Sequence, residues 1–393
     1  MDKDVVAQIR QAVDEQRLVD TAMKLIAVPS PTRSAGAVAD CLAQILDADG
    51  FTVERPVADW PEAPAVAVRF DSGRPGRVLQ FDGHLDTVHL PFVPPRHEQG
   101  CLYGSGSSDM KGGIAAFVEA LRVLRDTDAL RGGGILLTAH DHHEGPWGDR
   151  RQLYALIREG YTGDAVMLPE YLADRLPVAG RGMGIFEVRI RRDGVPVHEV
   201  LQPAGNPDVL GAGAQLVVSC QQLAKRLAHN THEYAGCDTA FVGRIQSGEI
   251  YNQSPVECVV HGTRRWVTPG TIDAVRAEFD NLLQALAASR GVDIDFDFEV
   301  QGDAFSIDLE DPLVEAFQGA HTECTGAPLP LGCKPFVDDG NSFAQLAGIP
   351  ALTHGPAATG AHTLSEQVPV PELVRVAQVY ALTAVCYCST AGA

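Results

Sequence analysis

The chain has 393 residues, of which 45% are hydrophobic and 21% charged, and its formal net charge at pH 7 is -20. This length exceeds what one hydrophobic core usually organises, so we expect two domains with ample apolar material for their cores. The negative charge argues against nucleic acid and against an anionic membrane as partners, because both attract basic surfaces.

The first predicted elements are helical. The opening residues, Met1 to Asp4, are charged and lack the apolar core of a secretory signal. Apolar residues then recur at helical spacing from Val5 to Ile26, and a second helix is predicted over residues 37–47. Nowhere does an apolar run approach the roughly 18 residues of a membrane span. Because the nine cysteines are also scattered along the chain, we expect a cytoplasmic protein with reduced thiols.

Two short strands follow, over residues 64–70 and 77–81, and the second reads as a buried strand. His84 and Asp86 come just after it and point to the same side of the chain, because alternate residues do so. The carboxyl ends of strands are where open α/β sheets place their sites.

A glycine-rich stretch over residues 104–113, GSGSSDMKGG, then leads into apolar residues spaced for an amphipathic helix. Asp109 would lie in the turn before that helix, with its carboxylate free to face a metal. A histidine and two carboxylates in such turns are the side chains of a zinc-type site. The alternative is a loop between strand and helix in which Asp109 is only a cap.

The sequences HLDTV at 84–88 and GSGSSDMKGG resemble the signature of a metallopeptidase family. That family contains glutamate carboxypeptidase, succinyl-diaminopimelate desuccinylase, acetylornithine deacetylase and carnosine dipeptidase, and the resemblance extends over nearly the whole chain. It implies an α/β fold: a zinc-exopeptidase-like catalytic domain with a mixed central sheet flanked by helices, plus an inserted α+β lid that forms a dimer interface.

The next strand, residues 134–139, leads into His140-Asp141-His142-His143-Glu144. Such a polar run is costly to bury unless it binds or pairs with something, although a solvated loop would also account for it. The resembled family has two adjacent glutamates here, a general base and then a metal ligand. Counting from Asp109 without a gap places this pair at His143 and Glu144.

His143 would therefore be the base, since an imidazole titrates near neutral pH. A shift of one or two residues would instead make His143 or His142 the ligand and His142 or Asp141 the base. Further on, Glu170 follows a predicted strand over residues 164–168, and the resemblance makes it the residue that completes the first metal site.

The pattern changes after residue 180. Alternating strands over 185–190, 241–245 and 256–260 are interleaved with helices over 209–227 and 272–286. We therefore predict catalytic segments at residues 1–180 and 303–393, with a lid and dimerisation domain at 181–302.

Within the lid, the resemblance assigns three substrate contacts. His198 corresponds to a histidine that stabilises the developing oxyanion, and Asn252 to an asparagine that binds substrate. Arg264 or Arg265 lies near the family's carboxylate-gripping arginine, and we select Arg265.

The catalytic domain resumes near Phe305 and ends in a helix predicted over residues 370–386. Glycine-rich segments between these points resemble the carboxypeptidase branch of the family. His362, in one of them, is implied as the last ligand of the second metal.

The implied site holds one or two divalent ions, and its nitrogen and oxygen donors suit zinc, manganese or cobalt. One ion would take His84, Asp109 and Glu170, and the other would take Asp109, Glu144 and His362, with Asp109 shared between them. Asp86 would orient His84.

Three functions remain open. The first is a metal-dependent hydrolase of an amide or peptide bond in a small carboxylate-bearing molecule, such as an N-acyl amino acid or a dipeptide, acting as a homodimer or higher homo-oligomer. The second is a hydrolytic deaminase of an activated aromatic amine such as a nitroanthranilate, suggested by the unusual pair His142-His143. The third, an inactive binding protein, is disfavoured because all five ligand positions carry competent side chains.

Overall fold

A computed structural model describes residues 2–389, and the chain divides into two compact units. The first unit consists of the chain up to Val178, Ile307–Lys334 and the chain from Ser342 onward, and the second of Ala179–Ser306 and Pro335–Asn341. The catalytic and lid roles predicted for residues 1–180, 181–302 and 303–393 stay predictions.

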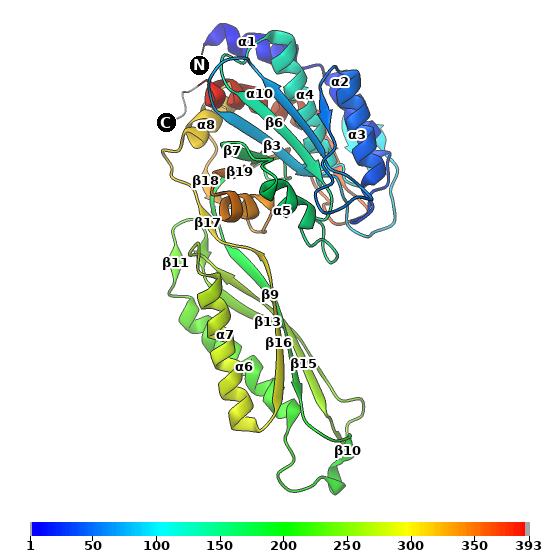
Figure 1. The fold of residues 1–393 in the computed structure, drawn as a ribbon, viewed down its shortest axis with the longest axis vertical. Coiled ribbons are helices and arrows are strands. Elements are labelled where there is room, and N and C mark those ends of the chain that lie inside the picture. The colour runs from blue at the N-terminus through cyan, green and yellow to red at the C-terminus, as the bar shows by residue number, and fades with distance from the viewer. Residues whose placement is uncertain (1, 390–393) are drawn as a thin grey trace. The chain divides into compact units, whose positions relative to one another are not determined.

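The first unit is built on a six-stranded mixed sheet (Figure 1). Four neighbouring strands, β6, β3, β7 and β19, run parallel, and β2 and β1 continue the sheet antiparallel. In order across the sheet, the strands are β1 (Val53–Glu54), β2 (Val66–Asp71), β6 (Gly134–His140), β3 (Val78–His84), β7 (Ala165–Leu168) and β19 (Ala351–Thr353).

Helices cover both faces of this sheet. On one face, the Phe81 ring of β3 stacks on Phe117 of α4, with centroids 4.4 Å apart, and Tyr380 of α10 packs beside it. On the other face, Leu153 of α5 packs on Val166 of β7. The helices of this unit are α1 (Lys3–Ala12), α2 (Glu15–Ile26), α3 (Gly36–Ala48), α4 (Lys111–Thr127), α5 (Arg151–Arg158), α8 (Pro312–Thr325), η2 (Phe343–Ala347) and α10 (Val370–Cys388).

The helix predicted from Val5 to Ile26 is in fact two helices. Val13 has an extended backbone, and the Asp14 side chain accepts a hydrogen bond from the N–H of Arg17 at 2.9 Å. That contact caps a new helix, so the continuous apolar spacing conceals a break.

The second unit contains a four-stranded antiparallel sheet covered on one face by two helices, α6 (Val209–Leu227) and α7 (Ile272–Arg290) (Figure 1). Phe186, Val260, Leu216 and Phe279 belong to the core between them. Across the sheet the strands are β13 (Thr239–Ser247), β15 (Glu257–Trp266), β9 (Gly182–Arg191) and β16 (Asp293–Gly302). With the mixed sheet of the first unit, this confirms the predicted α/β fold class with an α+β insertion.

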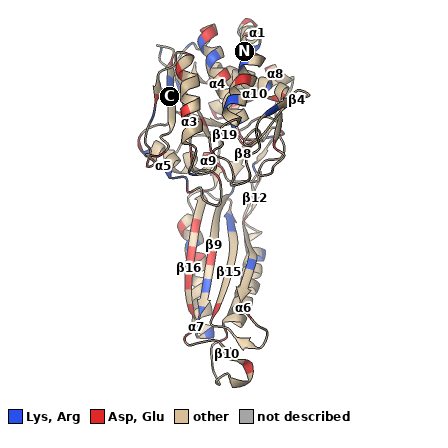
Figure 2. Cartoon of the chain, turned by 90° about the vertical axis from the view of Figure 1, so that its right-hand side faces the viewer, with Lys and Arg blue, Asp and Glu red and all other residues tan. Residues whose placement is uncertain are grey.

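The edge strand β16 alternates acidic and apolar side chains, and Figure 2 shows the acidic positions recurring along it. Asp293, Asp295 and Asp297 are exposed, whereas Phe298 is buried in the core. Charge on an edge strand discourages its pairing with another sheet.

The remaining elements are short. They are β4 (Arg96–Glu98), β5 (Cys101–Tyr103), β8 (Leu176–Gly180), β10 (Val197–His198), η1 (Glu199–Leu201), β11 (Thr231–His232), β12 (Gly236–Cys237), β14 (Gln253–Ser254), β17 (Phe305–Ser306), β18 (Leu331–Cys333), α9 (Asp339–Ser342) and β20 (Gln367–Pro369). Within residues 2–389, no helix has the length and apolar character needed to cross a bilayer.

Candidate metal centre

His84 is the last residue of β3, and both of its ring nitrogens face an oxygen. Nδ1 lies 2.9 Å from the main-chain oxygen of Asp86, and Nε2 lies 3.3 Å from Oδ1 of Asp109. The Asp86 carboxylate is farther from the ring, at 3.7 Å from Nδ1. The main-chain oxygen of Asp86, rather than its predicted carboxylate, is therefore the atom that orients His84, and it leaves Nε2 free to bind a metal.

The Asp86 carboxylate instead binds main-chain groups of the loop that follows β6. It accepts hydrogen bonds from the main-chain N–H groups of His143, at 3.1 Å, and Glu144, at 2.9 Å. Asp86 thus fastens the loop after β6 to the loop after β3, because β3 and β6 are parallel neighbours that end at the same edge.

Asp109 lies just before α4, as predicted, and its two carboxylate oxygens face different histidines. Oδ1 faces His84, and Oδ2 lies 3.2 Å from Nε2 of His362. The same His362 nitrogen is 3.1 Å from Oε2 of Glu144. Four of the five predicted ligands therefore converge, although they come from segments far apart in the sequence.

Glu170, the fifth predicted ligand, lies close to His143. Its Oε1 is 3.9 Å from Nε2 of His143, whose ring stacks on His84 with centroids 4.1 Å apart. At this site two sets of candidate ligands each have their atoms within 4.8 Å of one another: His84 with His143 and Glu170, and His84 with Asp109 and Glu144.

The electrostatics of this cluster favour a cation. Burial opposes protonation of His84, but the carboxylates of Asp109 and Asp86 outweigh burial and raise its pKa well above the usual value. Hydrogen bonds donated by the His362 ring to the carboxylates of Asp109 and Glu144 raise the pKa of His362 to about 10. The neighbouring carboxylates therefore favour a positive charge at both histidines, and a metal ion would supply that charge.

The donor atoms also fit a metal. Nε2 of His84 and Oδ1 of Asp109 are buried and lack a hydrogen-bond partner, which is costly for polar atoms unless an ion coordinates them. The set combines imidazole nitrogens with carboxylate oxygens, which suit zinc, manganese and cobalt alike.

The other polar residues after β6 have structural contacts. The Asp141 carboxylate accepts from the main-chain N–H groups of Arg33, at 2.8 Å, and Ala35, at 2.9 Å. The buried His142 ring packs edge-on against Trp60, with centroids 4.5 Å apart. These contacts favour the ungapped alignment, with His143 rather than its neighbours beside the ligands.

The predicted substrate contacts lie in the second unit. His198, on β10, and Asn252, which directly precedes β14, are hydrogen-bonded to each other, with Nε2 and Nδ2 3.0 Å apart. Arg264 is buried and bound to Asp238 and Glu278, at 3.0 and 3.1 Å. Because its guanidinium is bound to these two carboxylates, Arg264 is not available to bind the carboxylate of a substrate.

Arg265 is the better candidate of the two arginines, since it is half-buried and has no acidic partner within residues 2–389. Burial and the charge of nearby Arg181 lower its pKa. Arg181 was not assigned a role from the sequence, because a single arginine between two strands carries no distinguishing pattern.

Lys111 was also missed. It is fully buried, and its ammonium donates to the main-chain oxygen of Val28 at 2.8 Å. Burial lowers its pKa to about 7, against the opposing effect of Glu366 and Asp86. Its place two residues after Asp109, in DMKGG, was the available signal.

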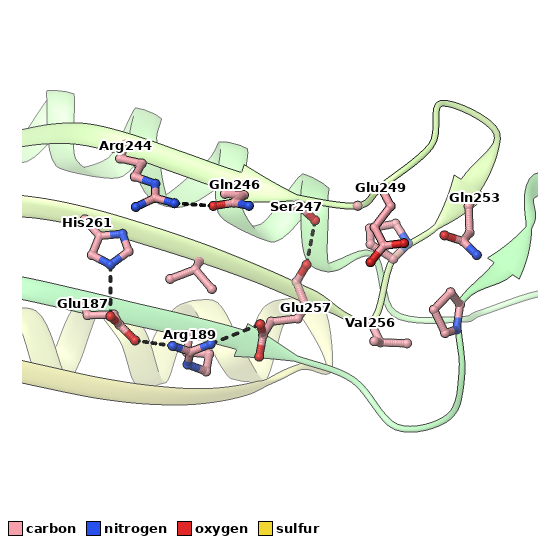
Figure 3. Close-up of a pocket in the computed structure, with 14 residues that line it drawn as sticks. Glu187, Arg189, Arg244, Gln246, Ser247, Glu249, Gln253, Val256, Glu257 and His261 are labelled. Carbon is pink, nitrogen blue, oxygen red and sulfur yellow. Dashed lines mark hydrogen bonds and ion pairs between the residues drawn. The ribbon is translucent and has the colours of Figure 1, made fainter.

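The second unit has a hollow of about 510 Å³ over β9, β13 and β15 (Figure 3). Four of its side chains pair with each other: His261 bonds to Glu187 at 3.0 Å, and Arg189 to Glu257 at 3.1 Å. None of the predicted site residues lines it, so we do not identify it with the catalytic site.

Comparisons with known proteins agree with this geometry. The model of peptidase family M20/M25/M40 matches residues 81–385. Succinyl-diaminopimelate desuccinylase of Alkalilimnicola ehrlichii is 29% identical over 382 residues, which cover 92% of this chain and 96% of that protein.

Solved structures share the fold. Aminopeptidase PepT from Bacillus cereus superposes with a TM-score of 0.81 at 21% identity, covering 95% of this chain and 99% of its own. The YXEP protein of Bacillus subtilis, described as a dinuclear metal binding peptidase from the M20 family, superposes with a TM-score of 0.67 at 17% identity and covers 94% of this chain and 97% of its own.

Proposed function

Since the chain belongs to peptidase family M20/M25/M40, we propose that it is a metal-dependent hydrolase that cleaves the amide bond of a small carboxylate-bearing substrate, such as an N-acyl amino acid or a dipeptide. The observation that carries the proposal is the convergence of His84, Asp109, Glu144 and His362 on one another, with Glu170 close to His143. These are nitrogen and oxygen donors from the end of β3 and from four loops, with unpartnered buried atoms at their centre.

The five predicted ligands would hold one or two divalent ions, and the identity of the ion, zinc, manganese or cobalt, is part of the proposal. A bound ion would polarise the scissile carbonyl and make water a better nucleophile. His143 would accept the proton of the attacking water and return it to the leaving nitrogen. The hydrogen bond from its main-chain N–H to the Asp86 carboxylate, at 3.1 Å, supports this proposal because it fixes the backbone of His143.

The second unit would supply the substrate contacts. Arg265 would bind a carboxylate, since a guanidinium can donate two parallel hydrogen bonds to it. His198 would stabilise the developing oxyanion, and Asn252 would hydrogen-bond the substrate. An N-succinyl amino acid carries the carboxylate that Arg265 requires, and the relative from Alkalilimnicola ehrlichii is named for removing a succinyl group.

We also propose a homodimer or higher homo-oligomer formed through the second unit. Its support is exposed apolar surface: Tyr251 is 100% exposed and Val200 75% exposed, and β13, with Phe241 exposed, lies at an edge of its sheet. Tyr251→Asp should shift the sedimentation coefficient toward that of a monomer. An unchanged coefficient would place the interface elsewhere, and a monomeric parent protein would refute the oligomer. The cytoplasmic location stays a prediction.

The central test is to measure bound metal and hydrolysis together. The purified protein, reconstituted with zinc, manganese or cobalt, should release amine from N-succinyl amino acids, other N-acyl amino acids or dipeptides. Less than about one equivalent of metal after reconstitution would contradict the proposal. Ammonia release from aromatic amines would support the deaminase, which is not favoured because the curated relatives are named for desuccinylation.

A further inference from the structure

Glu366 is a buried carboxylate that contacts the loop carrying Asp109. Oε1 accepts the main-chain N–H of Gly106 at 3.1 Å, and Oε2 accepts those of Ser108 and Asp109, both at 3.3 Å. Oε2 also accepts the Ser108 hydroxyl at 3.0 Å. Four donors around one 5% exposed side chain form a closed cradle for an anion.

This cradle adds to the hydrogen bonds that the loop makes within itself and to Val93, such as Ser107 N–H to the Gly104 oxygen at 3.0 Å. Gly106 has a φ of +81°, in the left-handed region, and Met110, the cap residue of α4, makes no side-chain capping bond. The Glu366 carboxylate satisfies N–H groups that would otherwise lie buried without an acceptor. The main-chain N–H of Asp109 is therefore bound by a residue 257 positions later in the chain.

Glu366 is also tied to the segment that carries His362. Its main-chain oxygen accepts the N–H of Gly104 at 3.4 Å, and the next residue, Gln367, pairs with Tyr103 across β20 and β5. Four residues before Glu366, His362 lies in a turn closed by the bond from the Thr363 N–H to the Gly360 oxygen at 3.0 Å.

We infer that Glu366 is a positioning residue that fixes Asp109 and His362 relative to each other, so that both face the same metal site. The inference rests on the proposed function but does not restate it, because Glu366 does not itself offer an atom to the metal. Its side chain holds one ligand loop, and its main chain continues into the other. Loss of either contact should let Oδ2 of Asp109 and Nε2 of His362 move away from their separation of 3.2 Å.

The test compares two substitutions that separate position from charge. Glu366→Gln removes the negative charge and replaces one acceptor by a donor that opposes the loop N–H groups. Glu366→Asp keeps the charge but shortens the side chain by one methylene. Both variants should bind zinc about 10- to 100-fold more weakly than the parent in a competition titration with a chelator, as loss of an outer contact to a metal ligand typically does.

A matched control is Glu372→Gln. Glu372 also accepts a main-chain N–H, that of Ala357 at 2.9 Å, and pairs with Arg375, but it contacts neither the Asp109 loop nor the turn at residues 360–363 that carries His362. It should keep the parent's zinc affinity. The visible absorption of cobalt-loaded protein should change for both Glu366 variants and stay the same for the control.

Three outcomes would overturn the inference. One is parental zinc affinity and cobalt absorption in both Glu366 variants. Another is a parental zinc affinity of Glu366→Asp together with a weaker affinity of Glu366→Gln, which would show that the charge of the side chain matters and its position does not. The third is an equal loss in Glu372→Gln. Should Glu366→Gln fail to fold, Glu366→Asp decides. A parent protein that binds no metal would instead refute the proposed function.

Discussion

At the scale of single residues, His143 is the candidate site residue whose role an experiment must decide. The ungapped alignment puts His143 where the resembled family has a glutamate base, and the structure places that imidazole against His84 and Glu170. An imidazole in this place can be a base or a metal ligand, and the two roles predict different results.

His143→Ala tests the choice between these roles. As a base, His143 contributes about 10²- to 10⁴-fold to turnover, so kcat should fall by that factor while bound metal is unchanged. The measurements are steady-state kinetics and metal analysis of one preparation, with the exposed His97→Ala as the control. Loss of a metal equivalent along with turnover would identify a ligand, and unchanged kcat would move the base elsewhere.

His354 should make the fold sensitive to acid. It is completely buried, and burial, with the charge of Arg375, lowers its pKa well below the usual value. The unfolded chain therefore takes up a proton below about pH 6.5 that the folded chain does not, so stability falls with decreasing pH. Between pH 6.5 and 5.5 this residue should account for a loss of about 1 kcal/mol.

The check is urea unfolding at both pH values for the parent and His354→Gln. The variant should lose less stability on acidification by about that amount, whatever its stability at pH 7.5. His97→Ala, which removes an exposed histidine, should retain the parental slope. Equal slopes for the parent and His354→Gln would show that His354 does not titrate as described.

At the scale of elements, the strands and helices that carry the site are those whose pattern is strongest in the sequence. The predicted strands at 77–81 and 134–139 correspond to β3 and β6, and the helix after Asp109 is α4. The break between α1 and α2 was missed, because a single cap residue leaves the apolar spacing intact. The acidic and aromatic edge strand β16 was not predicted either.

The cap at Asp14 can be tested alone. Asp14→Ala removes the acceptor for the Arg17 N–H and should lower the free energy of unfolding by about 1 kcal/mol, with kcat unchanged. Chemical denaturation measures the change. Asp20→Ala, in the same helix but outside its cap, should be nearly neutral. A fully stable Asp14→Ala would mean that water or another group replaces the cap.

At the scale of the whole molecule, metal binding should be linked to folding. The ligands come from loops more than 250 residues apart, from His84 to His362, so the unfolded chain cannot hold them together. A ligand that binds only the folded state stabilises it by mass action.

Chelation should therefore abolish hydrolysis and lower the melting temperature, and restoring the metal should reverse both. Free metal at 100 times its Kd should stabilise the protein by about 2.7 kcal/mol. His84→Ala, which lacks one ligand, should show a smaller gain in the same calorimetric experiment. If the melting temperature were the same with and without metal, the ions would not bind to the cluster in the folded protein.

The sequence by itself determined the fold class, the family and the residue types of the candidate site. Those properties follow from local patterns: alternation in strands, helical spacing, and the short motifs around His84 and Asp109. Only the tertiary structure decided that the main-chain oxygen of Asp86 orients His84, that Arg264 is occupied and Arg265 is not, and that Glu366 holds the Asp109 loop. These contacts are hydrogen bonds between loops that are distant in the sequence. Such bonds produce no periodic pattern of residues, so the sequence alone does not reveal them.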